Sequence, residues 1–242
     1  MELILYYFEY YGFLFVLLAS VFAMMAGAGV NSTFRRYSAQ KIGFQWSASQ
    51  AAERVLRDNG IFDVKIARTS GNLTDHYNPK DRTIYLSDAV YDSNSTAAIG
   101  VATHEAGHAV QHAVGYFPLR IRSLLVPITN LGSRLSYPLI LLGLFFSAFS
   151  SSPYGYEIAL VGVALFSLSV VFQLVTLPTE FNASRRAISA LESTGYLSSE
   201  ELIGAKKTLK AAAMTYVAAL AVSLTQFLRL LAIVLGNGRR RR

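Results

Sequence analysis

The sequence predicts an α-rich integral membrane protein with about four transmembrane helices and a smaller α+β portion built from two polar segments. Two observations predict this class. Hydrophobic residues make up 52% of the 242 residues and charged residues only 15%, whereas soluble domains carry about 25% charged residues. The apolar residues are also gathered into long blocks. The chain has no cysteine, which excludes a disulfide framework and a thiolate metal site.

A helix needs roughly 20 apolar residues to cross a ~30 Å hydrocarbon core, and four blocks approach that length. The second block, residues 135–149, is the shortest. It reaches back to Leu124 if the Arg134 side chain extends to the membrane surface. The alternative is that this block forms a buried or re-entrant helix. The fourth block is interrupted only by Arg229. The expected spans are residues 10–30, 135–149, 158–178 and 211–235.

The basic residues predict how the chain is oriented. Glu2 and Glu9 precede the first span and no Lys or Arg does, which argues against a cleaved signal peptide. Basic residues mark the cytoplasmic side of a membrane, and the turn expected at 150–156 has none. The two polar segments and the residues beside them carry Arg35, Arg36, Lys41, Arg120, Arg122, Arg134, Arg185, Arg186, Lys206, Lys207 and Lys210. This pattern places the N-terminus outside and both polar segments in the cytoplasm.

The C-terminal run Arg239–Arg242 contradicts that orientation, because a fourth crossing would place it outside. The same run supplies four of the net seven positive charges, which leaves three for the rest of the chain. A basic run beside an apolar segment is suited to lipid headgroups. The expected partners therefore include the lipid bilayer and no nucleic acid.

The two polar segments contain recognisable helix boundaries. Ser47 and Ser95 stand where helix N-caps are expected, and Gly60 is placed to end the first helix in the left-handed conformation. The second polar segment, 179–210, is helical by pattern, with a capping box at 198–201. In the first polar segment the expected elements are helices at 47–59 and 96–113, strands at 61–67 and 83–86, and a turn at 78–81.

The expected helix at 96–113 carries the pattern HExxH, in His104, Glu105 and His108. Residues i and i+4 lie on one face of a helix, so both imidazoles can reach a single tetrahedral Zn²⁺. The glutamate between them can take a proton from a water molecule that the metal activates. The alternative is a surface helix with two incidental histidines.

A zinc site of this kind needs a third protein ligand, and without cysteine that ligand is a histidine or a carboxylate. His112 lies on the same helix and cannot converge on the same ion, because nothing breaks the helix before Gly115. It is therefore interpreted as a helix-face residue. His76 has three open interpretations, namely a metal ligand, an oxyanion contact or a strand residue.

Glu180 is the strongest carboxylate candidate for the third ligand. It follows Pro178 at the mouth of an apolar helix, where a carboxylate is costly unless it is paired or bound to a metal. Two membrane crossings separate it from the HExxH helix, so the chain has returned to the same side. The alternative is an ion pair with Arg185 or Arg186.

Six stretches of the chain resemble one known family over nearly its whole length. They are residues 73–77, 85–87, 102–111, 115–120, 173–184 and 211–218. The chain resembles the membrane-bound neutral zinc metallopeptidases represented by YugP, and more distantly the HtpX-type gluzincins, in which a glutamate on a later helix completes the site. The resemblance implies His104, His108 and Glu180 as metal ligands and Glu105 as the general base.

The sequence departs from those relatives at one position. They commonly carry an acidic residue four positions after the ligating glutamate, where this chain has Ser184. An acidic group that orients a ligand cannot therefore be carried over, and Asn182 or Ser184 is the candidate to do so by hydrogen bonding. The candidates for outer contacts or contacts with the transition state are His76, Tyr77, Asn182, Ser184 and Arg185.

These features together predict a membrane-embedded zinc metalloendopeptidase with a zincin-like α+β catalytic portion and one Zn²⁺ per chain. Its substrate is a peptide or protein, which the strand at 83–86 could hold by edge pairing. The site lies on the cytoplasmic side of the cell membrane. The expected division is an N-terminal anchor at 1–31, a catalytic portion at 32–123, a transmembrane hairpin at 124–178, a second catalytic segment at 179–210, and a C-terminal helix with a basic tail at 211–242.

Two other classes were weighed against this function. An intramembrane protease of the site-2 type needs an aspartate on a later span, and no aspartate follows Asp92. A catalytically inert metal-binding membrane scaffold or partner-binding protein remains the alternative. Glu105 argues against it, because binding zinc alone does not require that residue.

Overall fold

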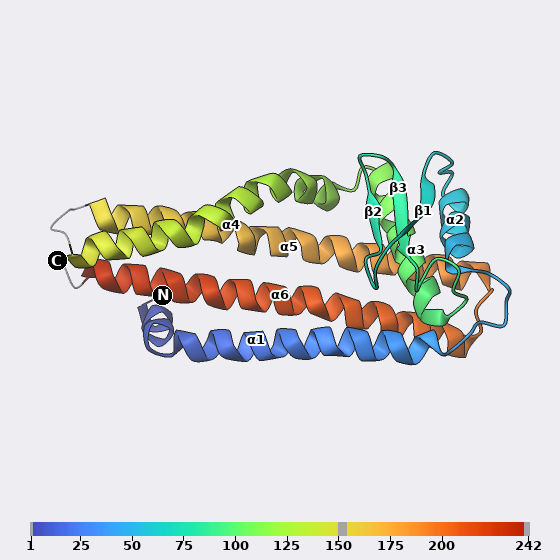
Figure 1. Ribbon diagram of the computed structural model, residues 1–242, viewed down its shortest axis with the longest axis horizontal. Coiled ribbons are helices and arrows are strands. Elements are labelled where there is room, and N and C mark those ends of the chain that lie inside the picture. Colours follow the sequence, from blue (N-terminus) through green and yellow to red (C-terminus); the bar gives the residue numbers. More distant parts are fainter. Residues whose placement is uncertain (1, 150–153, 240–242) are drawn as a thin grey trace. The chain divides into compact units, whose positions relative to one another are not determined.

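The computed structural model describes residues 2–149 and 154–239, which are mostly helical (Figure 1). Within these residues, four helices are long and apolar enough to cross a membrane. They are α1 Glu2–Ser38, α4 Phe117–Phe149, α5 Tyr154–Thr194 and α6 Ser199–Arg239. The expected α-rich membrane fold with four spans is confirmed.

The long helices extend beyond the apolar blocks that predict them. α4 begins at Phe117 and continues through Pro127 and Pro138. α5 continues through Pro178, so Glu180 lies within a continuous helix. The sequence analysis had placed it at the mouth of a helix, and that placement is wrong. Proline is tolerated inside membrane helices because neighbouring groups satisfy the backbone atoms that it frees. The turn expected at 150–156 falls largely outside the described residues, as does most of the terminal arginine run.

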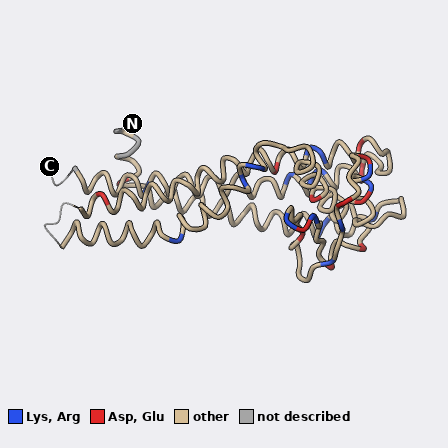
Figure 2. The backbone as a smooth tube through the Cα atoms, turned by 90° about the horizontal axis from the view of Figure 1, so that it is seen from above, with Lys and Arg blue, Asp and Glu red and all other residues tan. Residues whose placement is uncertain are grey.

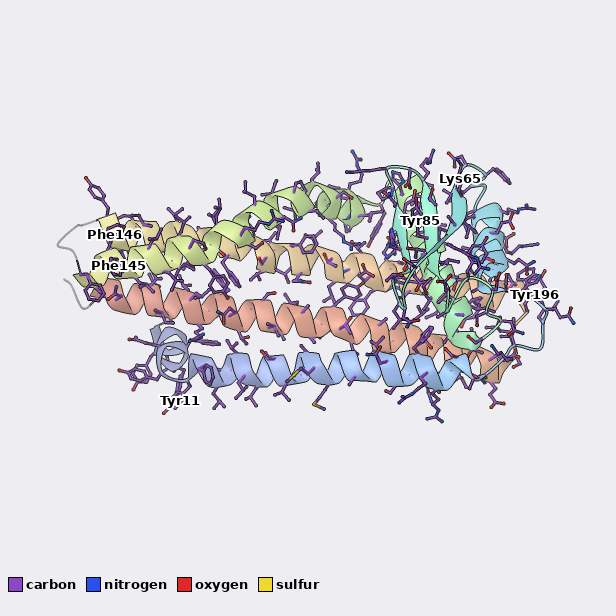
Figure 3. All side chains as sticks on the ribbon, in the orientation of Figure 1. Tyr11, Lys65, Tyr85, Phe145, Phe146 and Tyr196 are labelled. Atoms are coloured by element: carbon purple, nitrogen blue, oxygen red, sulfur yellow. The ribbon has the colours of Figure 1, made fainter. Side chains whose placement is uncertain are left out.

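Large apolar side chains are exposed along the spans. Phe145 and Phe146 on α4 are 56% and 42% exposed, and Phe13 on α1 is 67% exposed (Figure 3). Exposed apolar surface on this scale is unusual for a soluble monomer and is expected where side chains face lipid.

The chain divides into two compact units. Unit 1 comprises Met1–Met25, Ile121–Thr176 and Tyr216–Arg242, and unit 2 comprises Ala26–Arg120 and Leu177–Thr215. Charged residues are sparse along unit 1 and gather in unit 2 (Figure 2). In unit 1, α4 and α5 approach closely at Gly143, where an added Cβ would overlap the Ala159 backbone. Small residues allow such contacts between membrane helices.

Unit 2 contains a small sheet and two further helices beside segments of the long helices. The elements are α2 Ala48–Asp58, β1 Lys65–Thr69, β2 His76–Asn78, β3 Thr83–Ser87 and α3 Thr96–Ala113. Among the described residues the sheet has the order β1-β3-β2, with β1 parallel and β2 antiparallel to β3. Ile84 and Leu86 of β3 are fully buried in the core, which includes apolar residues of α2 and α3.

The helix boundaries expected in the polar segments are confirmed. Ser47 forms a capping box with Gln50 at the start of α2, and Gly60 follows that helix with φ of +70°. Ser95 caps α3 by accepting the Ala98 N–H at 3.2 Å. Ser198 and Glu201 form the reciprocal pair of a second capping box, at 2.7 and 3.3 Å.

The strands differ from the expectation in two respects. The first strand begins at Lys65 and not at Ile61, because the Ile61 N–H is still bonded to Leu56 O and so belongs to the turn after α2. β3 is the central strand of the sheet, with both edges paired. The expected edge pairing of a peptide with residues 83–86 is therefore wrong, and the edge beside α3 belongs to β2, which the sequence did not predict as a strand.

Candidate metal centre

His104, Glu105 and His108 all lie on helix α3. His104 and His108 are one turn apart on the same face, as the HExxH spacing predicts. The helix is rich in alanine and nearly all of its residues are buried. The two imidazole rings lie edge to face, with centroids 4.7 Å apart. The side chains of His104 and His108 are only 13% and 10% exposed, so both rings are largely shielded from water.

Glu180 on α5 converges with these two histidines. Its Oε2 atom lies 3.2 Å from His104 Nε2 and 3.5 Å from His108 Nε2. A tetrahedron with metal–ligand distances of about 2.0–2.1 Å has edges of about 3.3–3.4 Å. The observed separations therefore fit three corners of one zinc site. Among the described residues, this group of two histidines and one glutamate could hold a metal ion.

The Glu180 side chain is 2% exposed, and an unpaired carboxylate at that depth would be costly. The alternative ion pair involved Arg185 or Arg186. Arg186 donates its Nε–H to Asn182 Oδ1 at 2.9 Å. Arg185 lines a cavity of about 440 Å³ beside residues of α2 and α5. The partners that lie within 3.5 Å of the Glu180 carboxylate include both histidines.

Burial and charge act in opposite directions on His108. Burial disfavours its protonated form, whereas the hydrogen bond to Glu180 and the negative charge of Glu105 favour it. The net result is that the pKa of His108 is raised above its ordinary value. A buried imidazole beside two carboxylates is an environment suited to a cation.

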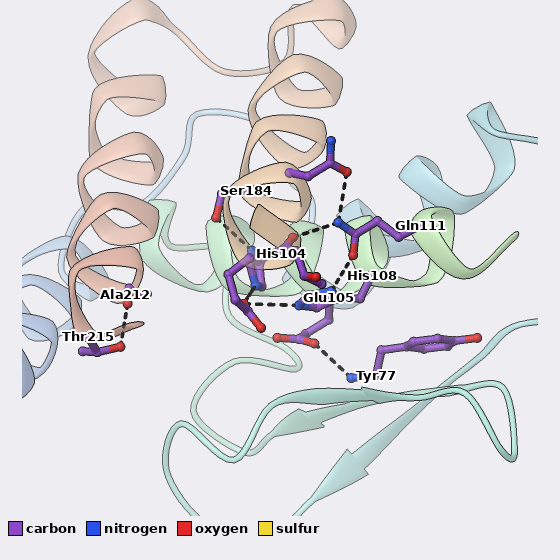
Figure 4. Close-up of polar contacts among 11 residues, drawn as sticks. Tyr77, His104, Glu105, His108, Gln111, Ser184, Ala212 and Thr215 are labelled. Atoms are coloured by element: carbon purple, nitrogen blue, oxygen red, sulfur yellow. Dashed lines mark hydrogen bonds and ion pairs between the residues drawn. The ribbon is translucent and has the colours of Figure 1, made fainter. Parts of the chain in front are cut away.

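Glu105 is held from the side of the sheet. Its Oε2 atom accepts the backbone N–H of Tyr77 at 2.9 Å (Figure 4), and the residue is only 8% exposed. A carboxylate that accepts a backbone N–H is held in one direction. The HExxH glutamate therefore points from α3 toward β2.

Two contacts fix β2 in front of α3. The Tyr77 hydroxyl lies 2.8 Å from His112 Nδ1, which joins the strand to the helix. Asp75 accepts the Ser87 N–H at 2.8 Å and the Ser87 hydroxyl at 3.0 Å, which ties the start of β2 to the end of β3. Burial raises the pKa of Asp75, and the hydrogen bonds from Ser87 partly offset this. His112 is thus a helix-face residue, as expected, with a contact to the strand.

Each imidazole also has a partner on its Nδ1 atom. Ser184 Oγ lies 3.1 Å from His104 Nδ1. Gln111 Oε1 lies 2.9 Å from His108 Nδ1. The sequence analysis did not single out Gln111, although its position three residues after His108 on a helix was a usable signal. Asn182, the other candidate, contacts Gln111, whose Nε2 atom lies 3.0 Å from Asn182 Oδ1.

His76 and Arg185 lie outside the His104–His108–Glu180 group. The exposed His76 ring stacks on Tyr85, with centroids 5.0 Å apart, and its Nδ1 atom is bonded to Thr74 O. Of the three interpretations of His76, the strand residue agrees with its position at the start of β2.

Gly107, inside the HExxH pattern, allows α3 to approach α5. A Cβ at this position would lie 2.7 Å from Ala183 O, closer than backbone packing allows. The contact lies one turn beyond Glu180 on α5 and beside His108 on α3. A glycine at this position therefore sets how near the two metal-site helices come.

Comparisons with known proteins identify the family of the chain. The family model described as "Putative neutral zinc metallopeptidase" matches residues 12–235. The "Putative membrane protease YugP" of Bacillus subtilis (strain 168) is 40% identical over 228 residues, which cover 94% of this chain and 98% of that protein. No solved structure matches the chain. With four apolar helices, a His–His–Glu group on α3 and α5, and a family match over most of its length, the chain belongs to the neutral zinc metallopeptidase family of membrane proteins.

Proposed function

We propose that the protein is a membrane-embedded zinc metalloendopeptidase that holds one Zn²⁺ through His104, His108 and Glu180. The observation that supports this most strongly is the convergence of donor atoms from three largely buried side chains, with separations of 3.2 and 3.5 Å along two edges. Two neutral imidazoles and one carboxylate form a ligand set that leaves a fourth position open, as in catalytic zinc sites.

Glu105 is the proposed general base. When bound, Zn²⁺ polarises a peptide carbonyl and activates a water molecule for attack. The Tyr77 N–H holds one oxygen of the Glu105 carboxylate, and the carboxylate accepts a proton from the attacking water. As the C–N bond breaks, Glu105 delivers this proton to the leaving amine, so that water is divided between the two products.

The proposed substrate is a peptide or protein in an extended conformation. β2 lies at the edge of the sheet beside Glu105, and an edge strand can bind a peptide through backbone hydrogen bonds. His76 and Tyr77 remain candidates for contact with the developing oxyanion. Their side chains contact Tyr85 and His112, respectively.

The proposal is tested with purified protein in detergent. We expect about one Zn²⁺ per chain and cleavage of casein. Removal of zinc with a chelator should abolish cleavage, and re-addition of Zn²⁺ should restore it, because three ligands remain in place. Zinc at full stoichiometry with no cleavage of any protein substrate would instead support the inert metal-binding scaffold.

We further propose the five-segment organisation given above, with the catalytic residues of 32–123 and 179–210 on the cytoplasmic side of the cell membrane. The distribution of Lys and Arg supports this orientation. In inverted membrane vesicles, an added protease should cleave the exposed loop around Phe62. Cleavage only in right-side-out cells would reverse the orientation.

A further inference from the structure

Gln111 is a fully buried polar side chain on α3, three residues after His108. An amide buried without hydrogen bonds destabilises the fold, so its contacts determine whether it can occupy this position. Its Oε1 atom lies 2.9 Å from His108 Nδ1. Its Nε2 atom lies 2.8 Å from Thr179 O and 3.0 Å from Asn182 Oδ1 (Figure 4).

The direction of every hydrogen bond in this group follows from its partners. Thr179 O is a backbone carbonyl and can only accept, so the NH₂ group of Gln111 must face it. The Arg186 guanidinium can only donate, so the Asn182 atom that it contacts at 2.9 Å is the amide oxygen. That oxygen is then also an acceptor for Gln111.

This order leaves the Gln111 oxygen facing His108. The His108 Nδ1 atom must therefore carry the proton, which leaves Nε2 as the atom with a free lone pair. That same Nε2 atom faces Glu180 at 3.5 Å. The network thus selects the tautomer that can bind a metal at the His104–His108–Glu180 group.

We propose that Gln111 is a positioning residue for the metal centre, and this proposal rests on the proposed function. It fixes the tautomer and the ring direction of His108. It also ties α3 to the turn of α5 that contains Thr179 and Asn182, on either side of Glu180. The Gln111 side chain thereby fixes the distance between His108 on α3 and Glu180 on α5.

The outer partners of both histidines are uncharged in this arrangement, since His104 is bonded to Ser184. A carboxylate in this position would raise the basicity of the ligand. An amide sets the tautomer without adding negative charge beside Glu180 and Glu105. Gln111 and Ser184 therefore take the orienting role for which the sequence offers no acidic residue at 184.

The test compares Gln111→Met with a matched control, Thr208→Val. Methionine has a similar length and cannot make the three hydrogen bonds. Thr208 is 4% exposed and its hydroxyl is bonded only within α6, to Gly204 O at 3.0 Å in the described contacts. Zinc affinity is measured by competition with a chelating dye, and the visible spectrum of the Co²⁺-loaded protein reports the ligand geometry.

We expect Gln111→Met to weaken zinc binding about 10- to 100-fold, the range for loss of an outer partner. The Co²⁺ spectrum should change, and kcat should fall while KM stays near the wild-type value, because Gln111 lies behind the ligand. Thr208→Val should leave all four readouts unchanged. Zinc affinity within about threefold of wild type in a folded Gln111→Met protein would overturn the proposal.

Asn182→Ala removes one partner of the Gln111 amide and provides the decisive measurement if Gln111→Met does not fold. It should weaken zinc binding less than tenfold but measurably, and unchanged affinity would overturn the proposal. The zinc measurement does not depend on hydrolysis. A wild-type protein that binds zinc but cleaves nothing would therefore refute the proposed function while leaving the role of Gln111 open to the same affinity comparison, which decides it.

Discussion

Replacement of Glu105 by Gln is expected to abolish peptide hydrolysis while leaving the zinc content near one ion per chain. Glutamine has the shape of glutamate and can still accept the Tyr77 N–H, but it cannot take a proton from water. Loss of a general base lowers the rate by about 10²–10⁴-fold. The measurement is casein cleavage by the purified variant, with zinc determined on the same sample.

The interpretation of Glu105→Gln depends on its zinc content. If the variant retained cleavage with full zinc, Glu105 would not be the base. If both zinc and activity were lost, the substitution would have disturbed His104 or His108, and the result would bear on metal binding only. Glu53→Gln is a suitable control, because Glu53 is an exposed carboxylate on α2 that is paired with Arg57 and lies outside the site.

Replacement of Glu180 by Ala is expected to remove zinc and activity together. Its carboxylate is the group shared by both imidazoles, at 3.2 and 3.5 Å, and without it two ligands remain. We expect the loss in zinc affinity to exceed the roughly 100-fold upper end for an outer partner. Metal analysis after dialysis against a weak chelator measures it.

A matched control for Glu180→Ala is Glu192→Ala, also on α5. Glu192 is half-exposed and paired with Lys206 on the surface, so its loss should leave zinc binding unchanged, as exposed ion pairs contribute little. Full zinc retention by a folded Glu180→Ala protein would exclude Glu180 from the ligand set. The third ligand would then have to come from elsewhere in the chain.

Much of the fold is predictable from the sequence because its signals are local. The four spans follow from runs of apolar residues, and the ends of α2 and α3 follow from Ser47, Gly60 and Ser95. Each signal lies within one helical turn or within one block of the chain. β2 was missed because three residues carry too little periodicity to indicate a strand.

The site divides in the same way. HExxH is a local pattern, since spacing on one helix brings His104 and His108 together. Glu180 lies 76 residues from His104. In the sequence it is indicated only by the return of the chain to the same side of the membrane and by the family resemblance. The spacing of Gln111 from His108 places the two side chains near each other on α3, but only the packed structure shows that Gln111 is buried, since a glutamine is usually exposed.

The membrane class, the α3 motif and its helix caps follow from the sequence alone, because they depend on composition and on neighbours a few residues apart. Three features are seen only in the folded chain: β2 and not β3 forms the edge beside Glu105, Glu180 meets both histidines, and Gln111 joins α3 to α5. They could not be read from the sequence because these contacts join segments distant in the chain. Their distances and hydrogen-bond directions exist only once the helices and the sheet have packed.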